Sequence, residues 1–102
     1  MIISRTPVRI NFFGGGTDFP EYYERCGGAV FGTAIDKHVY VSINRLSDFF
    51  EYKIRVGYSK SELVDDVRDI QHPSVRECLK YKDVTGNLDI HIFADLPAKT
   101  GL

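Results

Sequence analysis

The stretch Arg9-Ile10-Asn11-Phe12-Phe13-Gly14-Gly15-Gly16-Thr17-Asp18 decides the local fold, because an apolar strand pattern runs directly into three consecutive glycines. A hydroxyl and a carboxylate follow the glycines. Glycine has no Cβ, so the chain can turn sharply here and bring backbone N–H groups close to a ligand. The triplet matches neither the dinucleotide-binding pattern Gly-x-Gly-x-x-Gly nor the phosphate loop Gly-x4-Gly-Lys-Ser/Thr. The stretch therefore predicts a strand, a tight turn and a candidate ligand site.

A short helix is predicted directly after the turn, over Phe19 to Cys26. Asp18 fits its N-cap, Pro20 suits an early helical position, and Glu21 completes a capping box. An apolar stripe at helical spacing is expected to be buried, and it consists of Phe19, Tyr22, Tyr23 and Cys26. The pair Gly27-Gly28 then ends the helix. A helix N-terminus facing a glycine turn favours polar or anionic ligands, but the pattern also fits a plain turn in which Asp18 only caps.

Composition indicates an ordinary globular protein, and 102 residues allow one domain or part of one. Thirteen aromatic residues without a tryptophan predict a core rich in Phe and Tyr. The net charge of −1, with no basic run, gives no support for nucleic acid or an anionic membrane as a partner. The N-terminus carries no signal-peptide pattern, and no apolar run approaches the length of a membrane span.

Cysteine and histidine positions give no sign of a metal site. Cys26 and Cys78 lie far apart and outside any Cys-x-x-Cys or Cys/His cluster, which favours two reduced core residues over a disulfide or a metal site. Reduced cysteines make a cytoplasmic location the default expectation. The three histidines share no metal-ligand spacing, and they are His38, His72 and His91.

Alternating apolar residues predict strands along most of the remaining chain. The expected strands are Ile2 to Phe13 (with a kink or a sheet-edge position at Pro7), Ala29 to Ile35, His38 to Asn44, Phe49 to Tyr58 and Leu88 to Ala94. Residues 59–71 fit a helix or an irregular crossing, and the acidic pair Asp65-Asp66 within them is expected to be a solvated face. A second helix is predicted from Pro73 to about Lys82. This order predicts an α+β fold, with helices on one side of a mainly antiparallel or mixed sheet.

The first motif resembles that of a known enzyme superfamily. Thr6-Pro7-Val8-Arg9-Ile10-Asn11 followed by Gly14-Gly15-Gly16-Thr17-Asp18 is similar to the N-terminal substrate motif of the GHMP small-molecule kinases, named for galactokinase, homoserine kinase, mevalonate kinase and phosphomevalonate kinase. With Gly27-Gly28-Ala29-Val30 and Ala34-Ile35-Asp36-Lys37, the triple glycine resembles more closely the branch that phosphorylates D-glycero-D-manno-heptose phosphates. The resemblance implies the ribosomal protein S5 domain 2-like fold of the superfamily's N-terminal half.

The last residues, Asp95 to Leu102, resemble the beginning of the superfamily's second motif. In these kinases the motif continues into a glycine- and serine-rich run that cradles the ATP phosphates and helps to hold Mg2+. Its first ATP-binding residues here would be Thr100, Gly101 and Leu102, and Lys99 stands where a small residue is common. The resemblance implies that residues 1–102 are an incomplete N-terminal kinase domain without the catalytic Asp. We expect this segment alone to be inactive.

The resemblance implies an ATP- and Mg2+-dependent sugar kinase that transfers the γ-phosphoryl group of ATP to a hydroxyl of a heptose phosphate. Asp18 would accept hydrogen bonds from sugar hydroxyls, while the remaining substrate-binding residues would shape the pocket, namely Thr17 and the backbone of Gly14, Gly15 and Gly16. Arg9 would supply positive charge near the transferring phosphoryl group, and its alternative is an ordinary surface ion pair.

Three alternatives remain open at this point. The same chemistry could act on fucose, galactose or a mevalonate-type alcohol, although the Glu-His pair that would indicate galactose is absent at Gly15-Gly16. A non-catalytic α+β module that binds RNA or protein is the alternative from another class, and it predicts a basic face or stacking aromatics. Asp36-Lys37 is expected to be a bend, with a ligand role as its alternative.

Overall fold

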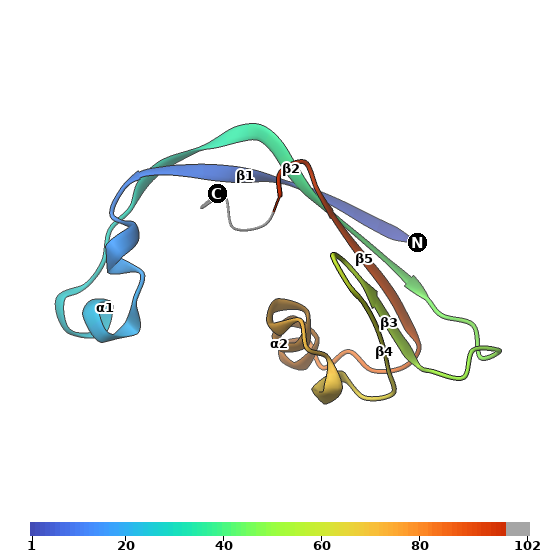
Figure 1. The fold of residues 1–102 in the computed structure, drawn as a ribbon. Coiled ribbons are helices and arrows are strands. Elements are labelled where there is room, and N and C mark those ends of the chain that lie inside the picture. Colours follow the sequence, from blue (N-terminus) through green and yellow to red (C-terminus); the bar gives the residue numbers. More distant parts are fainter. Residues whose placement is uncertain (98–102) are drawn as a thin grey trace. The chain divides into compact units, whose positions relative to one another are not determined.

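The computed structural model describes residues 1–97 as a five-stranded sheet with two α-helices and two 3-10 turns (Figure 1). The elements in chain order are β1 (Ile2–Phe13), η1 (Gly15–Thr17), α1 (Pro20–Cys26), β2 (Phe31–Arg45), β3 (Ile54–Gly57), β4 (Ser61–Val64), η2 (Val67–Asp69), α2 (Pro73–Tyr81) and β5 (Leu88–Ala94). The strand order is β1-β2-β5-β3-β4. β3 pairs antiparallel with β4 and parallel with β5, so the sheet is mixed and the predicted α+β class is confirmed.

The chain divides into two compact units. The first unit contains Met1–Arg5 and Tyr40–Phe93, and the second contains Thr6–Val39 and Ala94–Leu102, of which residues 98–102 lie outside the described part. β1 and β2 are long enough to run through both units. Each unit is therefore described separately below.

An aliphatic cluster forms the core of the first unit. Ile54 lies opposite Leu88 and Val56 lies opposite Ile90 in the parallel β3–β5 pair, so these four side chains share one face of the sheet. The buried cluster is completed by one residue that directly follows η2 and by one residue of α2, and it consists of Ile54, Val56, Ile70, Leu79, Leu88 and Ile90. The expectation of a core rich in Phe and Tyr is wrong, because most of the aromatic rings are exposed.

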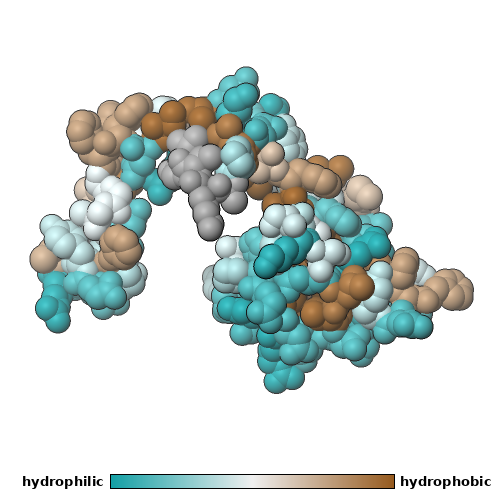
Figure 2. Space-filling view, viewed as in Figure 1, coloured by the Kyte–Doolittle hydropathy of each residue, from teal (hydrophilic) through white to brown (hydrophobic). Residues whose placement is uncertain are grey.

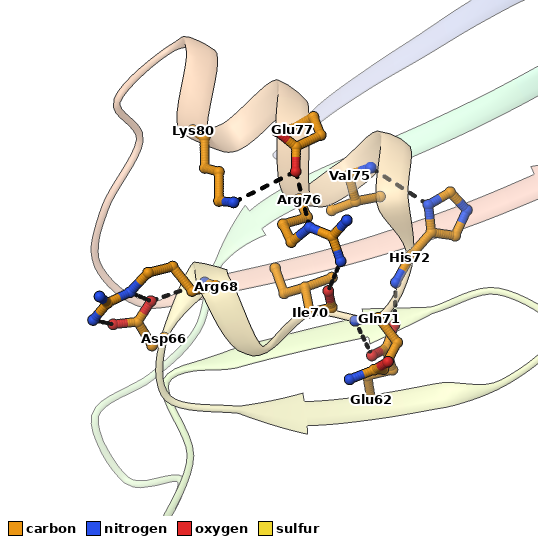
Figure 3. A network of polar contacts seen from close by, with 10 residues as sticks. All are labelled: Glu62, Asp66, Arg68, Ile70, Gln71, His72, Val75, Arg76, Glu77 and Lys80. Carbon is orange, nitrogen blue, oxygen red and sulfur yellow. Dashed lines mark hydrogen bonds and ion pairs between the residues drawn. The ribbon is translucent and has the colours of Figure 1, made fainter.

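Glu62 of β4 holds the start of α2 in place. Its carboxylate accepts the backbone N–H groups of Gln71 (2.6 Å) and His72 (3.1 Å), as Figure 3 shows, and the hydroxyl of Tyr58 (3.0 Å). Burial alone would raise the pKa of Glu62, but these three hydrogen bonds outweigh it and lower the pKa. His72 caps the helix by accepting the N–H of Val75 through Nδ1.

Several predicted strand boundaries are wrong because strand pairing overrides local signals. β2 is continuous through Asp36-Lys37, where a bend was expected. β3 is much shorter than Phe49 to Tyr58, and residues 59–71 contain the short strand β4 as well as η2. The sheet-edge position predicted at Pro7 is confirmed, because β1 is the edge strand and passes through Pro7 without a break.

Candidate functional site

The glycine turn between β1 and α1 depends on Gly14. Gly14 adopts φ +97°, and a Cβ at this position would lie 2.0 Å from the carbonyl oxygen of Ala29. A side chain is therefore excluded both by backbone conformation and by space. The next residues form η1, in which the N–H of Thr17 donates to Gly14 O (2.9 Å) and that of Asp18 donates to Gly15 O (3.2 Å). The predicted tight turn is thus a single 3-10 turn packed against Ala29.

The hydroxyl of Thr17 joins this turn to the segment that follows α1. Its Oγ1 donates to the carbonyl of Gly14 (2.8 Å), with the carbonyl of Ala29 as a longer acceptor at 3.2 Å. The same oxygen accepts the N–H of Ala29 at 3.2 Å. The hydroxyl is therefore engaged in contacts within the protein.

Asp18 does not cap α1, which corrects the predicted capping box. The N-cap residue is Phe19, and it makes no side-chain cap hydrogen bond. The carboxylate of Asp18 instead faces Arg9, with 3.8 Å between Arg9 Nη2 and Asp18 Oδ2. Both side chains are slightly more than half exposed, at 56% and 55%. The structure thus brings the two predicted charged residues together at the glycine turn and leaves both accessible to a ligand.

The other two glycines of the triplet have different surroundings. A Cβ on Gly15 would lie 3.2 Å from Asn11 Nδ2, whereas a Cβ on Gly16 would meet nothing within 4 Å. The side chain of Asn11 therefore lies beside Gly15, and its Oδ1 is buried without a hydrogen-bond partner among the described residues. The backbone at Gly16 is the open side of the turn.

The aromatic stripe of α1 is exposed, so its predicted burial is wrong. Phe19, Tyr22 and Tyr23 are 65%, 48% and 44% exposed, and Cys26 is also exposed. Gly27 does end the helix as predicted, with φ +68° and its N–H bonded to the carbonyl of Tyr23. Figure 2 shows hydrophobic residues at the surface where β1 and β2 approach α1, and the exposed ones there are Phe12, Phe13, Val30 and Phe31.

Asp95, the first residue of the second motif, is bonded to β2. The backbone N–H of His38 donates to Asp95 Oδ2 (2.8 Å), and the N–H of Asp95 donates to His38 O (2.9 Å). The imidazole Nδ1 of His38 lies 3.7 Å from Asp95 and 3.8 Å from the exposed carboxylate of Asp36. The predicted ATP-binding residues at 100–102 lie outside the described part of the chain.

Charged residues of the first unit have local structural partners. Asp66 accepts the side chain of Arg68 and caps η2, and these bonds lower the pKa of Asp66 to about 2. Asp65 accepts the backbone N–H of Lys53, and a cleft of about 410 Å3 lies beside these acidic residues. Arg55 forms a bidentate pair with Asp89.

Residues 1–97 contain neither a cluster of metal ligands nor a membrane-spanning helix. No group of three or more His, Cys, Asp or Glu side chains is placed to hold a metal ion. No helix in this range is long and apolar enough to cross a membrane. Both cysteines are free, and both are exposed rather than in the core as expected.

Sequence reasoning missed the role of Gly28 and Ala29. It assigned Gly28 to the end of the helix and to the family resemblance but not to packing, although a Cβ there would lie 3.0 Å from the carbonyl oxygen of Thr17. The second glycine of the Gly27-Gly28 pair was the available signal, because a single C-cap glycine would already end the helix.

The fold is similar to that of a solved kinase structure. A D-glycero-D-manno-heptose 1-phosphate kinase from Bacteriodes thetaiotaomicron superposes with a TM-score of 0.69 at 20% sequence identity, and the match covers 98% of this chain. The chain spans about a third (36%) of the length of that kinase. No protein-family model and no curated protein matches the sequence. The chain therefore has the α+β fold found in the N-terminal part of a heptose phosphate kinase.

Proposed function

We propose that this chain is the N-terminal, sugar-binding part of an ATP-dependent kinase that phosphorylates a hydroxyl of a heptose phosphate. The observation that carries the proposal is the exposed Arg9–Asp18 pair beside the glycine turn, on a fold shared with a heptose 1-phosphate kinase. Neither the fold nor the motif would suffice alone, because one fold can host unrelated functions.

The carboxylate of Asp18 is suited to a hydroxylated ligand. A carboxylate accepts several hydrogen bonds, and its hydrogen bonds with hydroxyl donors are shorter and stronger than hydrogen bonds between two neutral groups. The open backbone at Gly16 lets a sugar ring approach without meeting a side chain.

Arg9 would supply positive charge beside this carboxylate. The chemistry of phosphoryl transfer needs fixed charge near the transferring group more than it needs covalent catalysis. In the proposal ATP donates the phosphoryl group with Mg2+, bound through residues that begin at Thr100, while residues 9–18 bind and orient the sugar.

The test is a kinase assay on the protein with any sequence that its gene encodes beyond Leu102. D-glycero-D-manno-heptose phosphate, galactose, fucose and mevalonate are offered separately with ATP and Mg2+, and phosphorylated product is followed by 31P NMR. We expect turnover with the heptose phosphate. Turnover with only another acceptor would reassign the substrate, and no turnover with any of them would refute the kinase proposal.

Two substitutions test the assigned residues. Asp18→Ala should raise the KM for the sugar while ATP binding survives, and Glu24→Ala removes an exposed carboxylate of α1 as a matched control. Arg9→Ala should lower kcat more than it raises KM, as expected for an interaction made mainly in the transition state. Equal sugar affinity in Asp18→Ala and the unmodified protein would count against the assignment.

A further inference from the structure

We propose that Thr17 is a positioning residue of the sugar site, which acts by fixing the glycine turn to the backbone at Ala29. The inference rests on the proposed function, because the site that Thr17 positions is the sugar site. Thr17 does not touch the sugar in this proposal. It sets where the carboxylate of Asp18 lies.

The Thr17 hydroxyl makes its contacts with the protein backbone. It accepts the N–H of Ala29 (3.2 Å) and donates to Gly14 O (2.8 Å), so one oxygen links two segments that are 12 residues apart. A hydroxyl can donate one hydrogen bond and accept others, and here each capacity has a partner within the protein. The hydroxyl proton is therefore committed to the backbone, which favours an indirect role over direct sugar binding.

The backbone around the same contact is closely packed. A Cβ on Gly14 would lie 2.0 Å from Ala29 O, and a Cβ on Gly28 would lie 3.0 Å from Thr17 O and 3.1 Å from Thr17 Oγ1. The turn already touches the segment after α1, so it cannot move closer. The Thr17 hydroxyl bonds oppose movement in the other direction.

The position of Asp18 depends on the position of the turn. Asp18 directly follows Thr17, and its N–H donates to Gly15 O (3.2 Å) within the same 3-10 turn. Its side chain is 55% exposed and contacts Arg9 at the long distance of 3.8 Å. A single exposed ion pair orients a carboxylate weakly, so the backbone of the turn must do most of the positioning.

The experiment compares Thr17→Val, which keeps the side-chain shape without the hydroxyl, with Thr17→Ser, which keeps the hydroxyl. Amide hydrogen exchange of Ala29 in the ligand-free protein reports the bond to Thr17 Oγ1. Sugar KM, ATP KM and kcat are measured for the same variants in the longer protein of the kinase assay, which includes any sequence encoded beyond Leu102. We expect Thr17→Val to speed exchange at Ala29 and to raise the sugar KM, each by roughly tenfold, because the loss of the acceptor frees the turn. The ATP KM should stay unchanged, and Thr17→Ser should restore both values.

Each contrary result has a definite meaning. Unchanged exchange at Ala29 in Thr17→Val would overturn the anchor, and faster exchange with an unchanged sugar KM would overturn the positioning role. If Thr17→Val does not fold, Gly28→Ala takes its place, since the added Cβ presses on the same contact while the hydroxyl remains. An unmodified protein that phosphorylates no sugar would refute the proposed function and the sugar role together. Normal turnover with an unaffected Thr17→Val would refute only this inference.

Discussion

Each of the two units is stabilised internally by a different kind of contact. The first unit buries six aliphatic side chains in one cluster, and its turns are tied by the Glu62 hydrogen bonds. Among the described residues of the second unit, 6–39 and 94–97, none is buried. The second unit relies on close backbone approach at Gly14 and Gly32 and on the hydroxyl of Thr17.

Stability and function reside in different units of this chain. Burial of apolar surface is the dominant stabilising term in folding, so the first unit should resist opening. Ligand-binding segments are drawn from the less stable parts of proteins, and the candidate site lies entirely in the second unit. Core changes in the first unit should therefore have the largest effect on unfolding, and changes at the Arg9–Asp18 pair of the second unit should affect binding far more than unfolding.

The largest effect is expected from a cavity in the first unit. Ile70 is fully buried, so Ile70→Ala should lower the free energy of unfolding by about 3 kcal/mol through lost burial and the cavity left behind. Ile3→Ala is the matched control, because Ile3 is 65% exposed and should give a change within about 0.5 kcal/mol. Urea unfolding measures the free energy of unfolding of both variants. Equal losses in the two would contradict the stabilising role of the buried cluster.

The second effect concerns the backbone of the second unit. Gly14→Ala should lower the free energy of unfolding by about 2 kcal/mol, because alanine is strained at φ +97° and its Cβ would overlap Ala29. Gly16→Ala is the control, since a Cβ there meets nothing within 4 Å. Hydrogen exchange across residues 9–30 should rise in Gly14→Ala and stay unchanged in Gly16→Ala. If both variants behave alike, the packing at Ala29 does not hold the unit.

The third effect concerns the contribution of the Glu62 hydrogen bonds to the stability of the first unit. The pKa of Glu62 is lowered in the folded state from its ordinary value of 4.5. Its charged form therefore stabilises the fold at pH values above 4.5, and this contribution is lost as the pH falls through the folded-state pKa. Glu62→Gln should cost about 1 kcal/mol near pH 7, and the cost should shrink on acidification below pH 4.5. Glu51→Gln, at an exposed position, is the control in urea unfolding at each pH. A difference that does not depend on pH would refute the role of the charge.

The smallest effect on stability is expected at the candidate site itself. Asp18→Ala removes a half-exposed ion pair in which 3.8 Å separate Arg9 Nη2 from Asp18 Oδ2. The free energy of unfolding should therefore change by less than about 0.5 kcal/mol. Thermal unfolding of Asp18→Ala beside Glu24→Ala checks this expectation. A loss as large as that of Ile70→Ala would make Asp18 a structural residue of the second unit.

Much of the fold could be predicted from local sequence patterns. The alternation of Leu88, Ile90 and Ile92 located β5, and Pro73 marked the start of α2. The bend expected at Asp36-Lys37 was wrong, because pairing along the sheet keeps β2 extended through residues that favour turns. The aromatic stripe of α1 has helical spacing, but spacing alone does not supply a partner surface to bury it.

Local sequence patterns were enough to predict the elements that depend on neighbouring residues: the glycine turn, the end of α1 at Gly27 and the buried face of β5. Steric freedom at glycine and the two-residue period of a strand act over a few residues, so a linear pattern reveals them. Only the tertiary structure decided which distant groups meet. Asp18 faces Arg9 instead of capping a helix, and Thr17 bonds to Ala29, because these contacts depend on how β1, η1 and the segment after α1 pack.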